Sequence, residues 1–193
     1  MGRDRATRPE AKPLRLFVAV DLPEDVHAAV DRSAEPLHER FPGARWVPSA
    51  NQHVTLKFLG STWPRLVEWV SGSVEGVAAS HAAFETRVTG LGAFPSPRRA
   101  RVLWTGLDDP DGRLAAIARS LDSALEREFV PEKRSFTPHL TIARFDPPVI
   151  LGESLETVTV ESRLFSIDHL TVYRSHLRRP APVYEVLASF ELA

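Results

Sequence analysis

Residues 53–56 have the sequence His-Val-Thr-Leu, and residues 139–142 have the sequence His-Leu-Thr-Ile. In each segment a histidine and a threonine two positions apart interrupt an apolar run that is typical of a β-strand. On an extended chain this spacing puts both polar side chains on one face. The pattern therefore predicts two strands that each present an imidazole (His53, His139) and a hydroxyl (Thr55, Thr141) to a common site.

The two motifs are 86 positions apart, and a segment upstream of each matches at the same separation. Residues 15–18, Arg-Leu-Phe-Val, correspond to residues 101–104, Arg-Val-Leu-Trp. A duplicated unit of strand, helix and His-x-Thr strand accounts for both matches. We therefore expect an internal repeat over residues 14–92 and 100–193, with two similar lobes that face each other across a groove.

A third His-x-Thr segment occurs at His169 and Thr171, but position 83, which lies 86 residues before His169, is an alanine. This third segment therefore has no counterpart in the repeat. Because a three-residue pattern alone is a weak signal, we interpret His169 as an ordinary strand histidine and exclude it from the candidate site.

Composition limits the class of protein. A chain of 193 residues with 43% hydrophobic residues can bury a core of its own. The formal net charge of −1 argues against a protein that coats nucleic acid through bulk charge, although it permits a local basic patch. The absence of cysteine excludes disulfide scaffolds, thiolate metal sites and thiol nucleophiles. We expect a monomer that uses no cofactor.

The beginning of the chain is basic, and it lacks the apolar stretch that a secretory signal requires. We predict that residues 1–13 form a disordered basic tail and that residues 14–193 form a single bilobal domain. No apolar run approaches the ~20 residues that span a bilayer. We therefore expect no membrane association and a cytoplasmic location.

Hydrophobic periodicity predicts strands and helices on both sides of the motifs. We expect strands over residues 14–22, 84–91, 101–107, 161–176 and 183–192, and helices over residues 23–40, from Pro64 onward and from Asp109 onward. The second motif strand should begin at Pro138. The region that follows it contains Pro147, Pro148 and Gly152, so little regular helix is expected there.

Two histidines on facing strands can form an acid and base pair. Imidazole has an unperturbed pKa of about 6.5, so near neutrality one ring can be neutral while another is protonated. With a phosphodiester between them, one histidine takes a proton from the attacking oxygen while the other protonates the departing oxygen. Each threonine can donate its hydroxyl hydrogen to a non-bridging phosphate oxygen. The motifs therefore predict His53, His139, Thr55 and Thr141 as catalytic residues.

Two other interpretations of the motifs are less well supported. Hydrogen bonding within a sheet explains a single buried His and Thr pair, but two copies at the repeat separation favour a site. Histidines could also bind zinc, yet no Asp or Glu occupies a matching position in the motif strands and no His-Glu-x-x-His segment occurs. We therefore expect no metal.

Three further residues are candidates for substrate contacts. Arg144, five positions after His139, could pair with phosphate or stack on a base, but strict strand alternation points it away from His139. A bulge, a twist or the strand end would have to bring it to the groove. Lys57 shares the face of the first motif and is a second candidate for a phosphate contact, with solvent exposure as the alternative. Phe17, and with it Trp104, could stack on a nucleobase, although aromatic residues in such strands more often lie in the core.

These residues resemble the two-histidine phosphoesterase superfamily, and within it the RNA 2′,3′-cyclic phosphodiesterases formerly called 2′-5′ RNA ligases. The likeness covers nearly the whole chain. It includes Arg15-Leu16-Phe17-Val18-Ala19, residues 53–60, Phe94-Pro95, residues 101–104, residues 138–144, Tyr173-Arg174-Ser175 and Tyr184.

The resemblance implies an α+β fold, with two pseudo-symmetric lobes of antiparallel strands flanked by helices and a central groove lined by the two motifs. It implies a metal-independent hydrolysis of a terminal RNA 2′,3′-cyclic phosphate to a 2′-phosphate, and the joining of 2′-5′ linkages in reverse. It also implies His139 as the base toward water and His53 as the acid toward the ribose O3′. The proline-rich stretch after Arg144 departs from the family's usual helix, which leaves the rim of the groove and the substrate size open.

The partner predicted in this way is the 3′ end of an RNA or a small cyclic-phosphate nucleotide. One alternative is a phosphodiesterase of small cyclic nucleotides or of 2′-5′ oligonucleotides. Another is a nucleotide-binding or RNA-binding module without turnover, which is disfavoured because both histidines and both threonines are intact.

Overall fold

The computed structural model of the protein describes residues 12–160 and 162–193. The helices are α1 (Glu24–Arg40), α2 (Val67–Ala78) and α3 (Arg113–Leu125), with short 3₁₀ turns η1 (Ser49–Asn51), η2 (Pro64–Leu66), η3 (Pro97–Arg99) and η4 (Gly152–Leu155). The strands are β1 (Leu14–Val20), β2 (Arg45–Trp46), β3 (Val54–Thr62), β4 (Phe84–Thr86), β5 (Val88–Phe94), β6 (Ala100–Leu107), β7 (His139–Val149), β8 (Phe165–Ile167), β9 (His169–His176) and β10 (Val183–Glu191). Most of the predicted basic tail, residues 1–11, lies outside the described residues.

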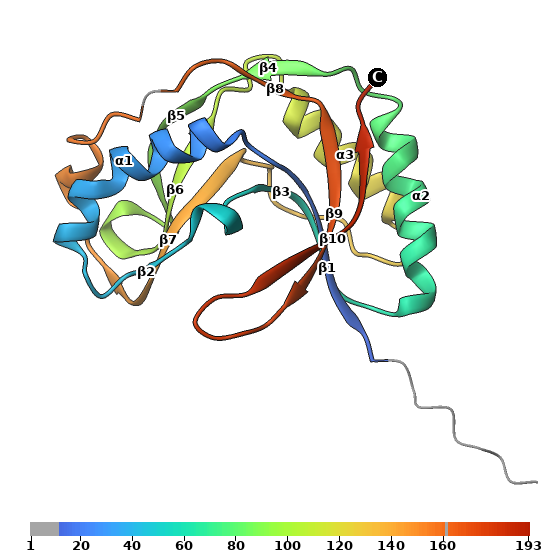
Figure 1. Ribbon diagram of the computed structural model, residues 1–193, viewed down its shortest axis with the longest axis horizontal. Helices are drawn as coiled ribbons and strands as arrows, with labels where there is room; N and C mark the ends of the chain where they lie inside the picture. The colour runs from blue at the N-terminus through green and yellow to red at the C-terminus, as the bar shows by residue number, and fades with distance from the viewer. Residues whose placement is uncertain (1–11, 161) are drawn as a thin grey trace, which may run out of the picture.

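Two four-stranded sheets form the framework of the protein. One has the strand order β10-β9-β1-β3 and the other the order β2-β7-β6-β5, and all pairings are antiparallel. A two-stranded ribbon of β4 and β8 completes the strands. Figure 1 shows α1 beside the sheet that contains β7, and α2 with α3 beside the sheet that contains β9. This arrangement confirms the predicted α+β fold with two sheets and flanking helices.

Each sheet combines strands from both predicted repeat units. The motif-bearing pairs β1–β3 and β6–β7 come from one unit each, but β9 from the second unit pairs with β1, and β5 from the first unit pairs with β6. The short strand β2 also crosses over, to pair with β7. Because each unit supplies strands to the other sheet, the two lobes in space are not the two halves of the sequence.

The register of the strands corrects the predicted match upstream of the motifs. Val20 pairs with Val54 in one sheet, and Thr105 pairs with Leu140 in the other. Val54 and Leu140 are 86 positions apart, whereas Val20 and Thr105 are 85 apart. The match of residues 15–18 with residues 101–104 at a separation of 86 is therefore wrong by one residue.

Both motif strands contain a β-bulge directly after the threonine. In β3 the extra residue is Leu56, because its neighbours Thr55 and Lys57 pair with consecutive residues of β1. In β7 the extra residue is Ile142, which follows Thr141. An extra residue reverses the alternation of side chains beyond it. The two residues that follow each bulge, Lys57 and Phe58 in β3 and Ala143 and Arg144 in β7, therefore lie on the faces opposite to those that strict alternation from the motif would give them.

The helices form where periodicity predicts them, because each has an apolar stripe to bury. In α1 the buried residues are Val26, Val30, Ala34 and Leu37, and in α3 they are Leu114, Ile117, Ala118, Leu121 and Leu125. The carboxylate of Asp109 accepts hydrogen bonds from the backbone N–H groups of Leu114 (3.1 Å) and Ala115 (3.2 Å) at the start of α3. Between β7 and β8, the residues that the structure describes form only the turn η4, as the prolines there predict.

Within the described residues, no helix combines the length and the hydrophobicity that a membrane crossing requires. The cytoplasmic location and the monomeric state stay predictions.

Candidate active site

One cavity lies where β3 and β7 approach each other, and both motifs open into it. Its volume is about 200 Å³. The residues that line it are Arg45, Trp46, Val47, Pro48, Asn51, His53, Thr55, His139, Thr141, Arg144, Pro180, Ala181, Pro182 and Tyr184. All four residues predicted as catalytic are therefore brought together in a single cavity.

His53 lies against aromatic rings. Its imidazole stacks on Phe17, with ring centroids 4.7 Å apart and planes 25° apart. Tyr184 meets it edge to face at 5.1 Å, and the centroid of the Tyr173 ring lies 6.0 Å away. These rings hold the imidazole in one orientation and remove most of its surface from water.

The pKa of His53 is lowered to about 4, chiefly because burial disfavours the charged imidazolium. The negative charge of Asp21 and the backbone carbonyl of Asn51 oppose this shift, and the positive charge of Arg144 adds to it. The unliganded protein therefore holds His53 in the neutral form at neutral pH.

His139 occupies the corresponding position in the other sheet, again beside aromatic rings. Phe94 contacts it edge to face at 5.1 Å, and the centroid of Trp104 lies 6.1 Å away. The Nδ1 atom of His139 lies 2.7 Å from the backbone carbonyl oxygen of Thr137. A carbonyl only accepts hydrogen bonds, so Nδ1 carries a proton and Nε2 is the nitrogen that exchanges a proton with a ligand.

Arg144 lies in the cavity together with His139 and Thr141. Strict alternation would have turned it away, but the bulge at Ile142 returns it to the face of the motif. Beside it lies Arg45, which pairs with Arg144 between β2 and β7. Arg45 escaped the sequence analysis because a two-residue strand leaves no periodic signal.

Lys57 does not line this cavity, because the bulge at Leu56 turns its side chain away from Thr55. The side chain is only 4% exposed, and its ammonium is paired with Asp122 of α3. This pairing argues against the predicted phosphate contact. A single extra residue in each strand thus explains why Arg144 lines the cavity and Lys57 points away from it.

Phe17 is 2% exposed and lies beneath His53, so in this structure it supports the imidazole and offers no free face to a nucleobase. Trp104 is packed over Gly92, where a methyl group would overlap the indole. Both aromatic residues therefore act as supports for the histidines. His169 lies outside the cavity, with its Nδ1 atom 2.9 Å from the carboxylate of Asp168.

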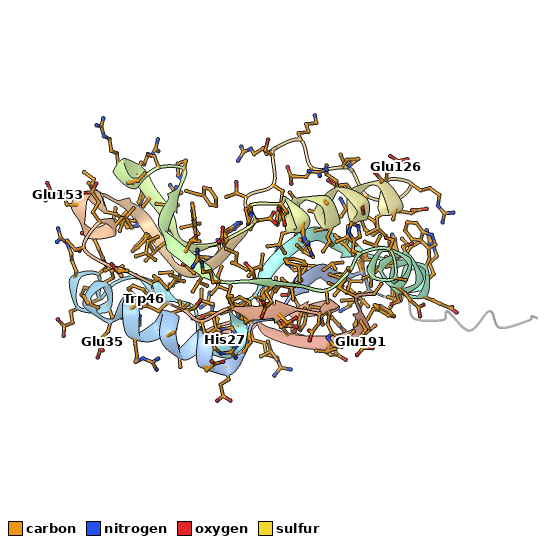
Figure 2. The ribbon with its side chains drawn as sticks, turned by 90° about the horizontal axis from the view of Figure 1, so that it is seen from above. His27, Glu35, Trp46, Glu126, Glu153 and Glu191 are labelled. Atoms are coloured by element: carbon orange, nitrogen blue, oxygen red, sulfur yellow. The ribbon has the colours of Figure 1, made fainter. Side chains whose placement is uncertain are left out.

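The far wall of the cavity is the loop between β9 and β10, which Figure 1 shows reaching toward η1. The side-chain amide of Asn51 donates a hydrogen bond of 2.8 Å to the backbone carbonyl of Pro182, which ties this loop to η1. Trp46, which also lines the cavity, stacks on His38 of α1 at 3.7 Å, and Figure 2 shows Trp46 beside this helix.

The charge of the cavity favours an anion. Among the described residues that line it, the formally charged side chains are Arg45 and Arg144, and none is a carboxylate. Within residues 12–160 and 162–193, no group of three His, Cys, Asp or Glu side chains is arranged to hold a metal ion. Two guanidinium groups, two imidazoles and two hydroxyls form a donor set suited to a phosphate group.

Comparison with known families agrees with this geometry. A model described as the 2′-5′ RNA ligase superfamily matches residues 22–179. The chain belongs to this superfamily. The resemblance inferred from the motifs is therefore confirmed.

Two curated relatives of the superfamily are RNA 2′,3′-cyclic phosphodiesterases. The one from Methanothermobacter thermautotrophicus is 30% identical over 186 residues, which cover 93% of this chain and 99% of the relative. The one from Geobacillus stearothermophilus is 30% identical over 184 residues, and the match covers 91% of this chain but 56% of the relative. Both relatives are named as phosphodiester hydrolases, as the sequence predicts for this chain.

Solved structures of the superfamily share the fold. TT0787 of Thermus thermophilus has a TM-score of 0.77 and 27% identity, with coverage of 93% of this chain and 98% of that chain. E. coli LigT in complex with phosphate has a TM-score of 0.74 and 26% identity, with coverage of 94% and 98%. Both matches therefore cover nearly the whole length of each chain.

Proposed function

We propose that the chain is a metal-independent RNA 2′,3′-cyclic phosphodiesterase that hydrolyses a terminal cyclic phosphate to a 2′-phosphate. The observation that carries the proposal is the meeting of His53, Thr55, His139 and Thr141 in one cavity. Among the described residues, the lining of this cavity includes two arginines and no carboxylate. The names of the curated relatives and the phosphate complex of E. coli LigT support the same ligand class.

The hydrolysis requires one proton to be taken and one to be given. A water oxygen attacks phosphorus, the new P–O bond forms, and the P–O3′ bond breaks. One histidine accepts the proton of the water, and the other donates a proton to O3′. The hydroxyls of Thr55 and Thr141 and the guanidinium of Arg144 hold the non-bridging oxygens, whose negative charge rises as the water attacks.

We assign His139 as the base and His53 as the acid. His139 has Nε2 available to accept a proton, because Nδ1–H is committed to the carbonyl of Thr137. A second, larger hollow also reaches His139, which gives water a path to it. With a pKa of about 4, His53 is protonated in about one unliganded molecule in a thousand at pH 7. A phosphate anion in the cavity raises that pKa, so His53 becomes a usable acid when substrate binds.

A substrate with an activated leaving group tests this assignment. In uridine 2′-(4-nitrophenyl phosphate), O3′ attacks phosphorus and nitrophenolate leaves without needing a proton. The oxygen of the leaving group then occupies the position of the attacking water, so the histidine near it becomes dispensable. We expect His139→Ala to retain most of this activity and His53→Ala to lose it. The opposite pattern would exchange the two roles.

The function itself is tested with an RNA that ends in a 2′,3′-cyclic phosphate, incubated with the purified protein and EDTA. We expect conversion to a 2′-phosphate by the wild-type protein and loss of conversion in both His53→Ala and His139→Ala. Binding without conversion would contradict the proposal and favour a recognition module. Loss of wild-type activity in EDTA would contradict the metal-independent mechanism.

A further inference from the structure

A carboxylate that has no part in the proposed hydrolysis so far is held by two hydroxyl groups of β9. Asp21 directly follows β1, and each of its carboxylate oxygens accepts one hydrogen bond. The hydroxyl of Thr171 donates to Oδ2 at 3.0 Å, and the hydroxyl of Tyr173 donates to Oδ1 at 2.7 Å. Thr171 belongs to the third His-x-Thr segment and is only 3% exposed. This segment, which lies outside the cavity, therefore helps to fix the carboxylate of Asp21 in one orientation.

The register of the sheet places Asp21 opposite His53. Val20, the last residue of β1, pairs with Val54, the first residue of β3. Continuing this antiparallel register by one residue sets Asp21 across from His53. Residues directly opposite on antiparallel strands point to the same face, with Cβ atoms about 4.5–5.5 Å apart. At this range the negative charge of Asp21 favours the protonated form of the imidazole.

The equivalent position in the other sheet is a glycine. Gly106 of β6 pairs with His139 of β7. A side chain does not fit at position 106, because a Cβ atom there would overlap the hydroxyl oxygen of Thr89. The two motif histidines therefore occupy matching positions in their sheets, but His53 faces a carboxylate across the strands whereas His139 faces a hydrogen atom. This difference favours a protonated ring at the proposed acid and not at the proposed base.

Asp21 is opposed by groups that disfavour the protonated imidazole. Burial of the ring has the largest effect, and the positive charges of His27 of α1 and Arg144 of β7 act in the same direction. Tyr173 and Tyr184, which lie beside the ring on β9 and β10, are neutral, because burial raises the pKa of both hydroxyls. Among the described side chains that act on the charge of this ring, Asp21 is the negative one.

We propose that Asp21 is a positioning residue for the hydrolysis, and that its carboxylate, fixed by Thr171 and Tyr173, stabilises the imidazolium of His53. The inference rests on the proposed function and adds to it a residue that acts through the acid. When a phosphate enters the cavity, its negative charge and that of Asp21 together favour protonation of His53. As water attacks, its proton goes to His139 and the new P–O bond forms. The P–O3′ bond breaks, O3′ takes the proton of His53, and the imidazole returns to its neutral form.

Two substrates that need opposite forms of His53 test the inference. Hydrolysis of uridine 2′,3′-cyclic phosphate needs the imidazolium, whereas in uridine 2′-(4-nitrophenyl phosphate) the neutral ring accepts the proton of O3′. Asp21→Asn keeps the shape of the side chain and removes its charge. Because an opposite charge at this range shifts a pKa by at least about one unit, the variant should lower kcat/KM for the cyclic phosphate at pH 7 about tenfold. The kcat/KM for the nitrophenyl ester should stay nearly unchanged.

Asp168→Asn is the matched control, because the carboxylate of Asp168 lies beside His169, outside the cavity. It should leave both rates unchanged. An equal fall of both rates in Asp21→Asn would show that Asp21 only maintains the shape of the site. An unchanged rate for the cyclic phosphate would show that its charge is not used. Either result overturns the inference.

NMR titration of the His53 ring in the unliganded proteins adds a measurement that does not depend on turnover. The pKa of His53 should be lower in Asp21→Asn than in the wild-type protein, and equal pKa values would also overturn the inference. A wild-type protein that is inactive toward both substrates rejects the proposed function and the inference with it. If the wild-type protein is active, any of the contrary results above rejects the role of Asp21 alone.

Discussion

The buried imidazole of His53 should make the stability of the protein depend on pH in a way that one substitution removes. In the unfolded chain a histidine takes up a proton near pH 6.5, but in the folded protein His53 resists protonation until about pH 4. Below pH 6.5 the unfolded state therefore binds more protons, and the free energy of unfolding falls as the pH falls. Stability is fully present above pH 6.5 and is lost progressively as the pH approaches 4.

The magnitude follows from the size of the shift. A change of one pKa unit corresponds to 1.36 kcal/mol, so the shift from 6.5 to about 4 corresponds to about 3 kcal/mol between pH 7 and pH 4. Carboxylates also titrate near the lower end of this range. The contribution of His53 is therefore obtained by subtracting the unfolding free energy of a variant that lacks this imidazole from that of the wild-type protein. His53→Gln has no titrating group at this position and provides the reference.

The assay is urea unfolding of wild-type protein and His53→Gln at intervals from pH 7.5 to pH 4. At each pH we take the difference in unfolding free energy between the wild-type protein and His53→Gln. We expect this difference to change by about 3 kcal/mol over the range, because only the wild-type protein loses stability through this ring. NMR titration of the His53 ring protons gives the folded pKa directly. Parallel stability curves, or a folded pKa near 6.5, would refute the burial argument.

Three further predictions concern residues around the cavity. Lys57→Met leaves the carboxylate of Asp122 without its buried partner, so it should lower the free energy of unfolding by about 3 kcal/mol in urea titrations. The KM for a cyclic phosphate should change little. A raised KM without loss of stability would instead indicate that Lys57 contacts the phosphate. Gly92→Ala places a methyl group against the indole of Trp104 and should cost about 1–3 kcal/mol, measured by thermal unfolding, with an unchanged melting temperature as the contrary result. Asn51→Ala removes the hydrogen bond to the carbonyl of Pro182 and should raise KM more than it lowers kcat, because a cavity wall loses its tether; equal KM values would show that the loop is held by other contacts.

The meeting of the four motif residues in one cavity could be predicted because its signal is local. A histidine and a threonine two positions apart share a face of any strand, and the repeat separation distinguishes the pairs at His53 and His139 from the third pair at His169. The structure agrees on both points, since two pairs enter one cavity and His169 lies outside it.

The basic residues that enter the cavity could not be predicted in the same way, because two bulges decide them. Alternation counted from the sequence keeps Lys57 with the motif and turns Arg144 away, and the structure reverses both. A bulge depends on how a strand pairs with its neighbour, and no residue type in either segment marks it. Arg45 was missed for a related reason, since it enters the cavity only because β2 pairs with a strand from the other half of the chain.

The central claim is that two histidines act on a phosphate as an acid and base pair without a metal. The most direct test is to measure kcat/KM for an RNA 2′,3′-cyclic phosphate as a function of pH, with EDTA present. Because kcat/KM reports the titration of the free enzyme, we predict a bell-shaped profile with its acidic limb near pH 4, the pKa of His53, and an alkaline limb set by a second group. A profile with a single limb, a profile that keeps its bell shape in His53→Ala, or an activity that EDTA abolishes would contradict it.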